Sequence, residues 1–304
     1  MTRSGEFKDS ATGAERFDAD IRGVRYAGID TGGAGDPVLL LHGWPDDRSM
    51  WRRQVGNLHA NGCRVIAIDW IGHGDSAKPS EIERYAIDEL VADLAALFRE
   101  RGLGRAHLVA HDYGAVIGWI FAAAHPDLVR TYSAIAIGHP GAVLRAISLR
   151  ALVNNWFLGF NALPVAVPLY RALGAAFFKW AMRAHPDRDA VVDKFRNDAH
   201  PLYIRIWERA NPIGALIGRF LLRSPARIGK LPMPVQGLYG VRDHYATPRA
   251  MSLSRRFVDG PWRFVPVNDA GHWSPLERPD EINSLLRSWF ALHAQREEQA
   301  NDVP

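Results

Sequence analysis

Asp112 lies at the centre of residues 110–114 (AHDYG), between an apolar run and a stretch with helical spacing. This spacing is typical of a nucleophile elbow, a tight strand-to-helix turn whose small flanking residues let the central side chain project into a site. The motif usually carries a serine between glycines, whereas here an aspartate is central and an alanine replaces the first glycine. Taken alone, the segment leaves one alternative open, an aspartate that caps the following helix.

A second segment, residues 41–45 (LHGWP), ends an earlier apolar run. A glycine there lets the backbone turn, so that the Trp44 N–H can face the same site as the Tyr113 N–H. Two such donors would form an oxyanion hole, which stabilises developing negative charge on oxygen. The alternative is an ordinary Gly/Pro turn.

Two further polar side chains follow apolar runs near the end of the chain. Asp243 comes shortly after residues 235–239, and His272 comes shortly after residues 262–267. The chain order nucleophile, acid, histidine is the order that the α/β-hydrolase fold uses. Together the segments predict a catalytic triad of Asp112, Asp243 and His272, and not a set of unrelated structural residues.

An aspartate nucleophile restricts the chemistry of such a triad. A carboxylate can displace a leaving group from a saturated carbon, which leaves an alkyl ester on Asp112. His272, oriented by Asp243, would then take a proton from the water that hydrolyses this ester. The substrate must therefore carry a strained C–O bond or a carbon–halogen bond, and peptides and common esters are disfavoured.

The elements that must position these residues alternate along the chain. Short apolar runs predict strands at residues 37–42, 64–69, 106–110, 131–137, 235–239 and 262–267. Helical spacing occurs at residues 50–60, 85–101, 115–124, 248–257 and 279–293. This alternation predicts a mostly parallel sheet with helices on both faces, the α/β-hydrolase fold, whose strand ends place the four segments together.

The alternation stops at residues 138–225, which are rich in Ala, Leu, Arg and aromatic residues and contain several prolines. We expect several short helices that form a lid over the sheet. The predicted organisation is therefore a core from two segments, a helical cap and two polar tails. Their bounds are 13–138 and 227–296 for the core, 139–226 for the cap, and 1–12 and 297–304 for the tails.

The composition is that of a globular protein with 47% hydrophobic and 23% charged residues. The 37 Lys and Arg residues are dispersed, so a nucleic-acid surface is not predicted. A polar N-terminus, no long apolar run and a single cysteine, Cys63, indicate a cytoplasmic chain without a membrane span. No metal-ligand cluster or phosphate loop is present, so no cofactor is expected. The sequence leaves the oligomeric state open, a homodimer included.

Four motifs resemble those of α/β-hydrolase-fold epoxide hydrolases and their dehalogenase relatives. They are HGWPDD, AHDYGA, GVRDHY and AGHWSPLERPDE, and the resemblance extends over nearly the whole chain from about Phe17. Residues 137–142 (IGHPGA), which open the lid, are similar to a bacterial epoxide-hydrolase branch. The resemblance implies that epoxide opening is the reaction. The many lid aromatics favour an apolar small-molecule substrate, a bulky one included, with lid packing as the alternative.

The chain departs from that family at the lid, where the resemblance implies two tyrosines that donate protons to the epoxide oxygen. Residues 154–164 and 210–225 contain no tyrosine. Tyr170 and Tyr203 lie elsewhere in the lid. For each of them taken singly, lid packing or a surface position is the favoured interpretation. Candidate lid residues for substrate binding or oxygen activation are His139, Asn155, Trp156, Phe160 and Tyr203.

Two other function classes remain open at this stage. Haloalkane dehalogenases usually carry a tryptophan after the nucleophile and often an asparagine after the His-Gly, positions that hold Tyr113 and Trp44 here. Fluoroacetate-type enzymes carry arginines just after the nucleophile, where this chain has Tyr113 and Val116. A non-catalytic binding protein is disfavoured because all three triad positions are filled. These comparisons favour epoxide hydrolysis over halide hydrolysis and over binding alone.

Overall fold

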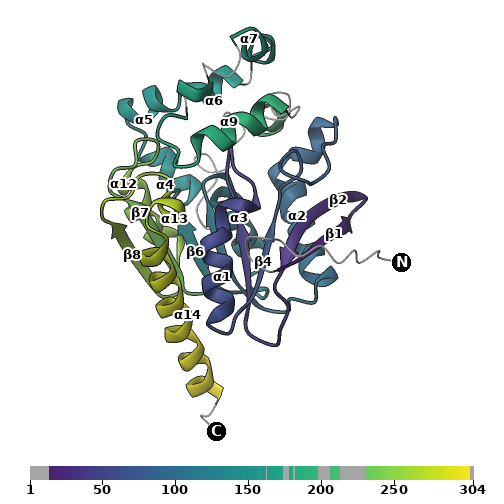
Figure 1. The fold of residues 1–304 in the computed structure, drawn as a ribbon. Coiled ribbons are helices and arrows are strands. Elements are labelled where there is room, and N and C mark those ends of the chain that lie inside the picture. Colours follow the sequence, from purple (N-terminus) through teal and green to yellow (C-terminus); the bar gives the residue numbers. More distant parts are fainter. Residues whose placement is uncertain are drawn as a thin grey trace.

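The strands of the computed structural model form one mostly parallel sheet (Figure 1). The structure describes residues 14–161, 163–173, 178–180, 182–197, 206–212 and 230–301. Within these residues the sheet has eight strands in the order β1-β2-β4-β3-β5-β6-β7-β8. The strands are β1 (Glu15–Ile21), β2 (Val24–Asp30), β3 (Pro37–Leu41), β4 (Arg64–Ile68), β5 (Ala106–His111), β6 (Val129–Ile135), β7 (Val235–Gly240) and β8 (Trp262–Val267).

Helices cover both faces of this sheet, because successive strand residues point to opposite faces and both sets are apolar. In β3, Leu39 and Leu41 belong to one buried cluster, whereas Val38 and Leu40 belong to another. The first cluster includes residues of α2 (Ile87–Glu100) and α3 (Tyr113–Ala124), and the second includes residues of α1 (Arg52–Ala60) and α14 (Pro279–Asn301). The α/β-hydrolase fold predicted from the alternation is confirmed.

The N-terminal hairpin was absent from the sequence prediction. β1 and β2 pair antiparallel through a turn at Arg22 and Gly23, both of which have positive φ (52° and 80°). This is the backbone that a two-residue hairpin requires, but Arg22 is an unusual residue for it, so the turn gave little signal. Buried and exposed residues alternate only weakly along β1, and its charged residues are exposed.

The described helices between β6 and β7 lie at the carboxyl end of the parallel strands (Figure 1). The named helices are α4 (Pro140–Arg145), α5 (Leu149–Asn154), α6 (Trp156–Asn161), α7 (Ala166–Leu173) and α9 (Arg188–Asn197). Residues 206–210 are also helical. The bounds 139–226 for a cap remain a prediction, because residues 213–229 lie outside the described part of the chain.

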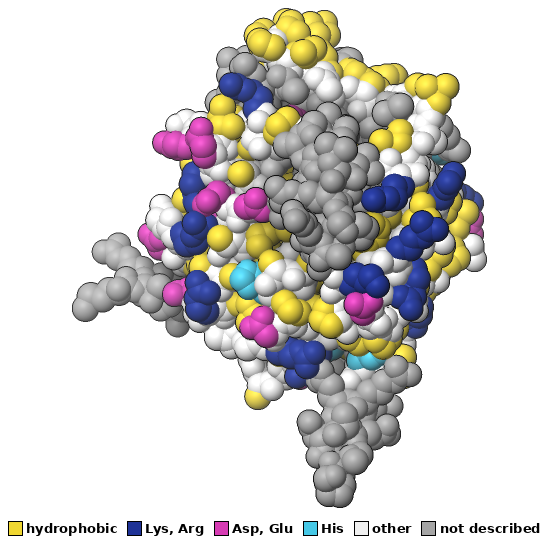
Figure 2. Space-filling model, turned by 180° about the vertical axis from the view of Figure 1, so that it is seen from behind, with side chains coloured by type: hydrophobic (Ala, Val, Ile, Leu, Met, Phe, Trp, Pro, Cys, Tyr) yellow, Lys and Arg dark blue, Asp and Glu magenta, His cyan; other side chains and the backbone are white. Residues whose placement is uncertain are grey.

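The C-terminal helix is longer than expected. α14 continues through Asn301, into the segment 297–304 that we predicted to be a tail. Residues 295–299 are all glutamine, arginine or glutamate, which are polar but have high helix propensity. Polarity alone was therefore a poor guide to where the helix ends. None of the described helices is long and apolar enough to cross a membrane. Figure 2 shows basic side chains interspersed with acidic and apolar ones on the face it presents.

Helix α3 begins directly against β3, and a glycine permits this contact. A Cβ placed on Gly114 would lie 2.5 Å from the carbonyl oxygen of His42 and 2.6 Å from that of Leu41. Both neighbours are backbone atoms, so neither can rotate away. The elbow at the start of α3 is therefore held against β3 by close backbone packing.

We expect Gly114→Ala to destabilise the protein by roughly 1–3 kcal/mol, because α3 must move away from β3 to admit the methyl group. Chemical denaturation followed by circular dichroism measures this loss. Gly56→Ala is the matched control: Gly56 lies within α1 with no atom within 4 Å of an added Cβ. That variant should be about 1 kcal/mol more stable than the parent. Equal effects at the two sites would contradict this account of the elbow.

Candidate active site

Asp112 joins β5 to α3 in a backbone conformation that non-glycine residues rarely adopt. Its φ is 51° and its ψ is −121°, the strained geometry that turns the side chain of an elbow residue out of the sheet. Gly43, at the end of β3, lies so close that a Cβ there would collide with the Asp112 side chain. The glycine in the LHGWP segment is therefore required by the approach of the nucleophile position.

The structure brings Asp112, His272 and Asp243 into one hydrogen-bonded chain. The His272 Nε2 lies 3.2 Å from Asp112 Oδ2, and its Nδ1 lies 2.8 Å from Asp243 Oδ2. The other oxygen of Asp243 accepts backbone N–H groups from Tyr245 (2.7 Å) and Ala246 (3.0 Å). The imidazole thus lies between two carboxylates, and the acid is fixed by its own loop.

The backbone on both sides of His272 is held by a carboxylate that the sequence analysis did not single out. Glu277 accepts the N–H of Gly271 at 2.8 Å and that of Trp273 at 3.1 Å. The His111 Nε2 lies 2.9 Å from the carbonyl oxygen of His272. Burial lowers the pKa of His111 to about 4, so this ring is neutral and its Nε2–H donates. Glu277 and His111 are positioning residues for the histidine.

A backbone N–H faces Asp112 from the end of β3. The Trp44 N–H donates to Asp112 Oδ1 at 3.1 Å, and the Tyr113 N–H also lowers the pKa of Asp112 by hydrogen bonding. His42 orients the turn that carries Trp44. Its Nδ1 donates to the Gly43 carbonyl (2.8 Å), while its Nε2 accepts the Trp70 N–H (3.0 Å). The two donors predicted for an oxyanion hole therefore lie beside the same carboxylate.

The charges of this cluster stabilise one another although the site is buried. Burial opposes ionisation of Asp112 and Asp243, but the neighbouring His272 outweighs it and holds both pKa values below their usual range. Burial likewise lowers the pKa of His272, yet the two carboxylates raise it to about 10. The resting site is therefore an imidazolium between two carboxylates.

The predicted lid residues occupy different environments. His139 is buried away from the triad: it caps α4 by accepting the Gly141 N–H, and its ring stacks on Phe257 at 3.8 Å. The Asn155 Nδ2 donates to the Tyr245 carbonyl at 2.8 Å, which ties the lid to the loop of Asp243. The structure thus places His139 in packing and Asn155 at the edge of the site.

The aromatic candidates lie in the lid itself. Trp156 is 37% exposed and contacts Phe160, whose ring in turn packs against Tyr170. Phe160 borders a buried cluster that joins the lid to Trp44 and Trp273 of the core. Tyr203 lies outside the described residues.

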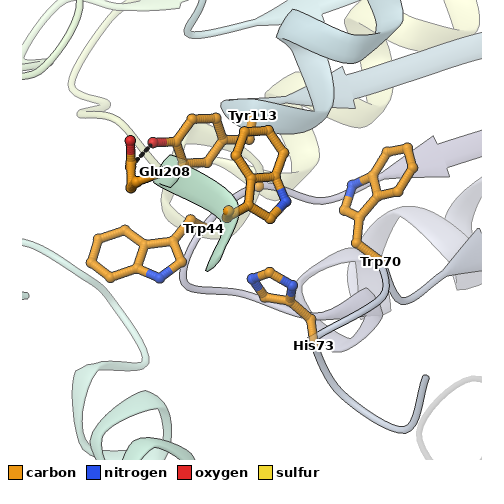
Figure 3. A pocket seen from close by; sticks show the side chains of 7 residues that line it. Trp44, Trp70, His73, Tyr113 and Glu208 are labelled. Atoms are coloured by element: carbon orange, nitrogen blue, oxygen red, sulfur yellow. Dashed lines mark hydrogen bonds between the residues drawn. The ribbon is translucent and has the colours of Figure 1, made fainter. Parts of the chain in front are cut away.

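A small pocket of about 10 Å³, roughly the space for one water molecule, lies beside Tyr113 and beside Trp44, whose N–H donates to Asp112 (Figure 3). Tyr113 and Glu208 point toward one another there, and the Tyr113 hydroxyl donates to Glu208 Oε1 at 2.5 Å. The sequence analysis missed Glu208, although it is the only acidic residue between Asp198 and Asp243. The lining residues are Gly43, Trp44, Trp70, His73, Tyr113, Trp207 and Glu208.

The pocket is lined mainly by aromatic rings. Among the residues that the structure describes, no group of three or more His, Cys, Asp or Glu side chains is arranged to hold a metal ion.

The fold and the elbow define an α/β hydrolase, and the family model for the alpha/beta hydrolase fold matches residues 36–279. This chain belongs to that family. It is similar to Epoxide hydrolase A of Mycobacterium tuberculosis, with 28% identity over 88% of this chain and 94% of that protein. It is also similar to Epoxide hydrolase 3 of Xenopus tropicalis, with 27% identity over 88% of this chain and 75% of that protein.

A solved structure supports the same fold. Cfl2 wild-type from Burkholderia cenocepacia superposes with a TM-score of 0.80 and 25% identity, covering 95% of this chain and 99% of that one. The resemblance to epoxide hydrolases that the motifs predicted is confirmed at the level of relatives.

The charge of His272 gives a direct test of the electrostatics. We expect Asp243→Asn and Asp112→Asn each to lower the pKa of His272, because each removes a negative charge and an ionic hydrogen-bond acceptor beside the imidazolium. Histidine titration by NMR measures both shifts. Asp269→Asn is the control, since this exposed acid lies near the same loop but should leave the pKa of His272 unchanged. An unshifted pKa in both triad variants would refute the charge arrangement.

Proposed function

We propose that this protein hydrolyses epoxides to diols through a covalent ester on Asp112. The observation that carries the proposal is the carboxylate in the elbow position, held by His272 and by the Trp44 N–H. The names of two relatives, Epoxide hydrolase A and Epoxide hydrolase 3, agree with a strained C–O bond as the target. We assign Asp112 as nucleophile, His272 as base and Asp243 as the acid that orients it.

In the first step, one oxygen of Asp112 attacks an epoxide carbon. A C–O bond forms to the carboxylate as the ring C–O bond breaks, and the departing oxygen takes a proton. The low pKa of Asp112 keeps it ionised and able to attack at neutral pH. A serine alkylated in the same way would become an ether, which His272 and water could not readily cleave.

Alkylation changes His272 from an acid into a base. Asp112 loses its charge when it becomes an ester, so one of the two carboxylates that raise the pKa of His272 disappears. The imidazolium can then release its proton, and the neutral ring accepts one from an attacking water. The N–H groups of Trp44 and Tyr113 stabilise the oxyanion of the tetrahedral intermediate, and the returned proton leaves with the diol.

We expect His272→Gln to accumulate the ester, because the variant keeps the nucleophile and lacks the base. Intact mass spectrometry after mixing with a panel of small epoxides should show an adduct of the substrate's mass. Asp112→Asn should show none, because an amide is a poor nucleophile. Turnover should fall by several orders of magnitude in either variant, since the triad acts as a unit.

The same variants separate the competing functions. An adduct from bromoalkanes together with none from epoxides would favour halide hydrolysis. No adduct with either panel, where the parent protein turns over the substrate, would exclude the ester mechanism.

Oxygen labelling tests the position of water attack. In a single turnover in heavy-oxygen water, the new diol oxygen should come from Asp112, and solvent oxygen should enter the Asp112 carboxylate. Peptide mapping locates the label, and mass analysis of the diol shows its absence there. Label in the first diol formed would indicate direct attack by water, with Asp112 as the base.

A further inference from the structure

Glu208 is a half-buried lid carboxyl group that contacts Tyr113, the residue after Asp112, and the proposed ester mechanism assigns it no role. It lies in the helical residues 206–210, and its partner is Tyr113, the residue directly after Asp112. Trp207 packs on the Tyr113 ring with the ring centroids 4.4 Å apart. The lid therefore places this carboxyl group over the elbow.

The segment that carries Glu208 is fixed to the core. Asn211 donates to the carbonyl oxygen of Tyr85 at 2.8 Å and accepts the N–H of Ile87, the first residue of α2, at 2.9 Å. Trp207 belongs to the main buried cluster. These contacts give Glu208 a defined position relative to Asp112, as a group that transfers a proton requires.

The surroundings of Glu208 favour its protonated form. Its pKa is raised to about 7: burial raises it most, the hydrogen bond from Tyr113 lowers it, and the charge on Asp112 raises it. Among the described residues it makes no ion pair with Lys, Arg or His. The titratable groups around it there are Asp112, Tyr113, Tyr170 and His73.

A buried carboxyl group without a cation destabilises a protein when it ionises, so packing alone would be served as well by an amide. The hydrogen bond from Tyr113 occupies Oε1. Among the described residues Oε2 has no hydrogen-bond partner, and it can carry the proton.

We propose, on the basis of the proposed function, that Glu208 is the proton donor to the epoxide oxygen, with Tyr113 holding it in place. As the Asp112 oxygen bonds to carbon and the ring C–O bond breaks, the Glu208 proton passes to the departing oxygen, which becomes the first hydroxyl of the diol. Glu208 is left as a carboxylate. The proton that His272 releases once Asp112 is esterified restores it, so the cycle consumes one epoxide and one water.

A protonated Glu208 bears on the substrate class. A halide leaves as a stable anion without a proton, whereas the alkoxide from an epoxide needs one. A carboxylic acid above the nucleophile therefore favours a C–O bond over a C–halogen bond. It also supplies a leaving-group donor in a lid whose sequence lacks the expected tyrosine pair.

The test measures ester formation in the His272→Gln background, where the ester accumulates, by quenched-flow mass analysis across pH. With Glu208 present, the rate should fall as pH rises through about 7, because the acid form is lost. Glu208→Gln should slow ester formation by roughly 10²–10³-fold at low pH and abolish that pH dependence. Asp189→Asn, a change of an exposed lid acid, is the control and should leave both unchanged.

Tyr113→Phe provides an independent readout. It removes the hydrogen bond that lowers the pKa of Glu208, so the falling limb should move to higher pH. Thermal unfolding checks that each variant is folded. The shift of the pH–rate profile can be measured in the phenylalanine variant even if the glutamine variant is unstable. An unchanged rate and pH–rate profile in Glu208→Gln would overturn the proposal. A Tyr113→Phe variant that forms the ester more slowly, with an unshifted pH–rate profile, would also overturn it. No ester with Glu208 intact would instead count against the proposed function.

Discussion

The position of one imidazolium between two buried carboxylates is the interaction on which the rest of the site depends. Each carboxylate would be costly to bury alone, and His272 offsets that cost for both Asp112 and Asp243. The elbow, the acid loop and the histidine loop come from three distant parts of the chain. Their mutual charge stabilisation is available only when all three are in place.

In the proposed mechanism, this arrangement also separates the two half-reactions. A low pKa for Asp112 suits it to attack, and the same interaction keeps His272 protonated and unable to act prematurely as a base. Esterification removes one charge and thereby changes the protonation that His272 favours. The site needs no moving part for this change, because the chemistry of the first step alters the electrostatics of the second.

Around the charged core, side chains that hydrogen-bond to the backbone provide the geometry. Glu277 and His111 hold the backbone around His272, and His42 holds the turn that carries the Trp44 N–H. The lid adds a carboxyl group, Glu208, that has no nearby cation among the described residues. Within that part of the chain it also lacks the backbone N–H donors that Asp112 has, and so the two carboxyl groups favour different protonation states.

The sequence by itself determined the parts of this protein that depend on neighbours in the chain. Short apolar runs and helical spacing predicted the six parallel strands and the main core helices. The elbow around Asp112 and the polar residues after two later strands predicted the site, because parallel strands bring their carboxyl ends to one edge. Weak local signals failed where polar residues formed regular structure, as in the β1–β2 hairpin and the end of α14.

Only the tertiary structure decided which lid residues face the nucleophile. His139 has the right chemistry and follows a strand, yet it stacks on Phe257 in the core. Glu208 has no motif around it, and its partner Tyr113 is 95 residues away in sequence. Such contacts arise when the lid docks on the core, and their effect on pKa comes from burial and from charges that are distant in the chain. Local spacing reports neither burial nor distant charges, so the sequence could locate the elbow aspartate but not the carboxyl group of Glu208 near it.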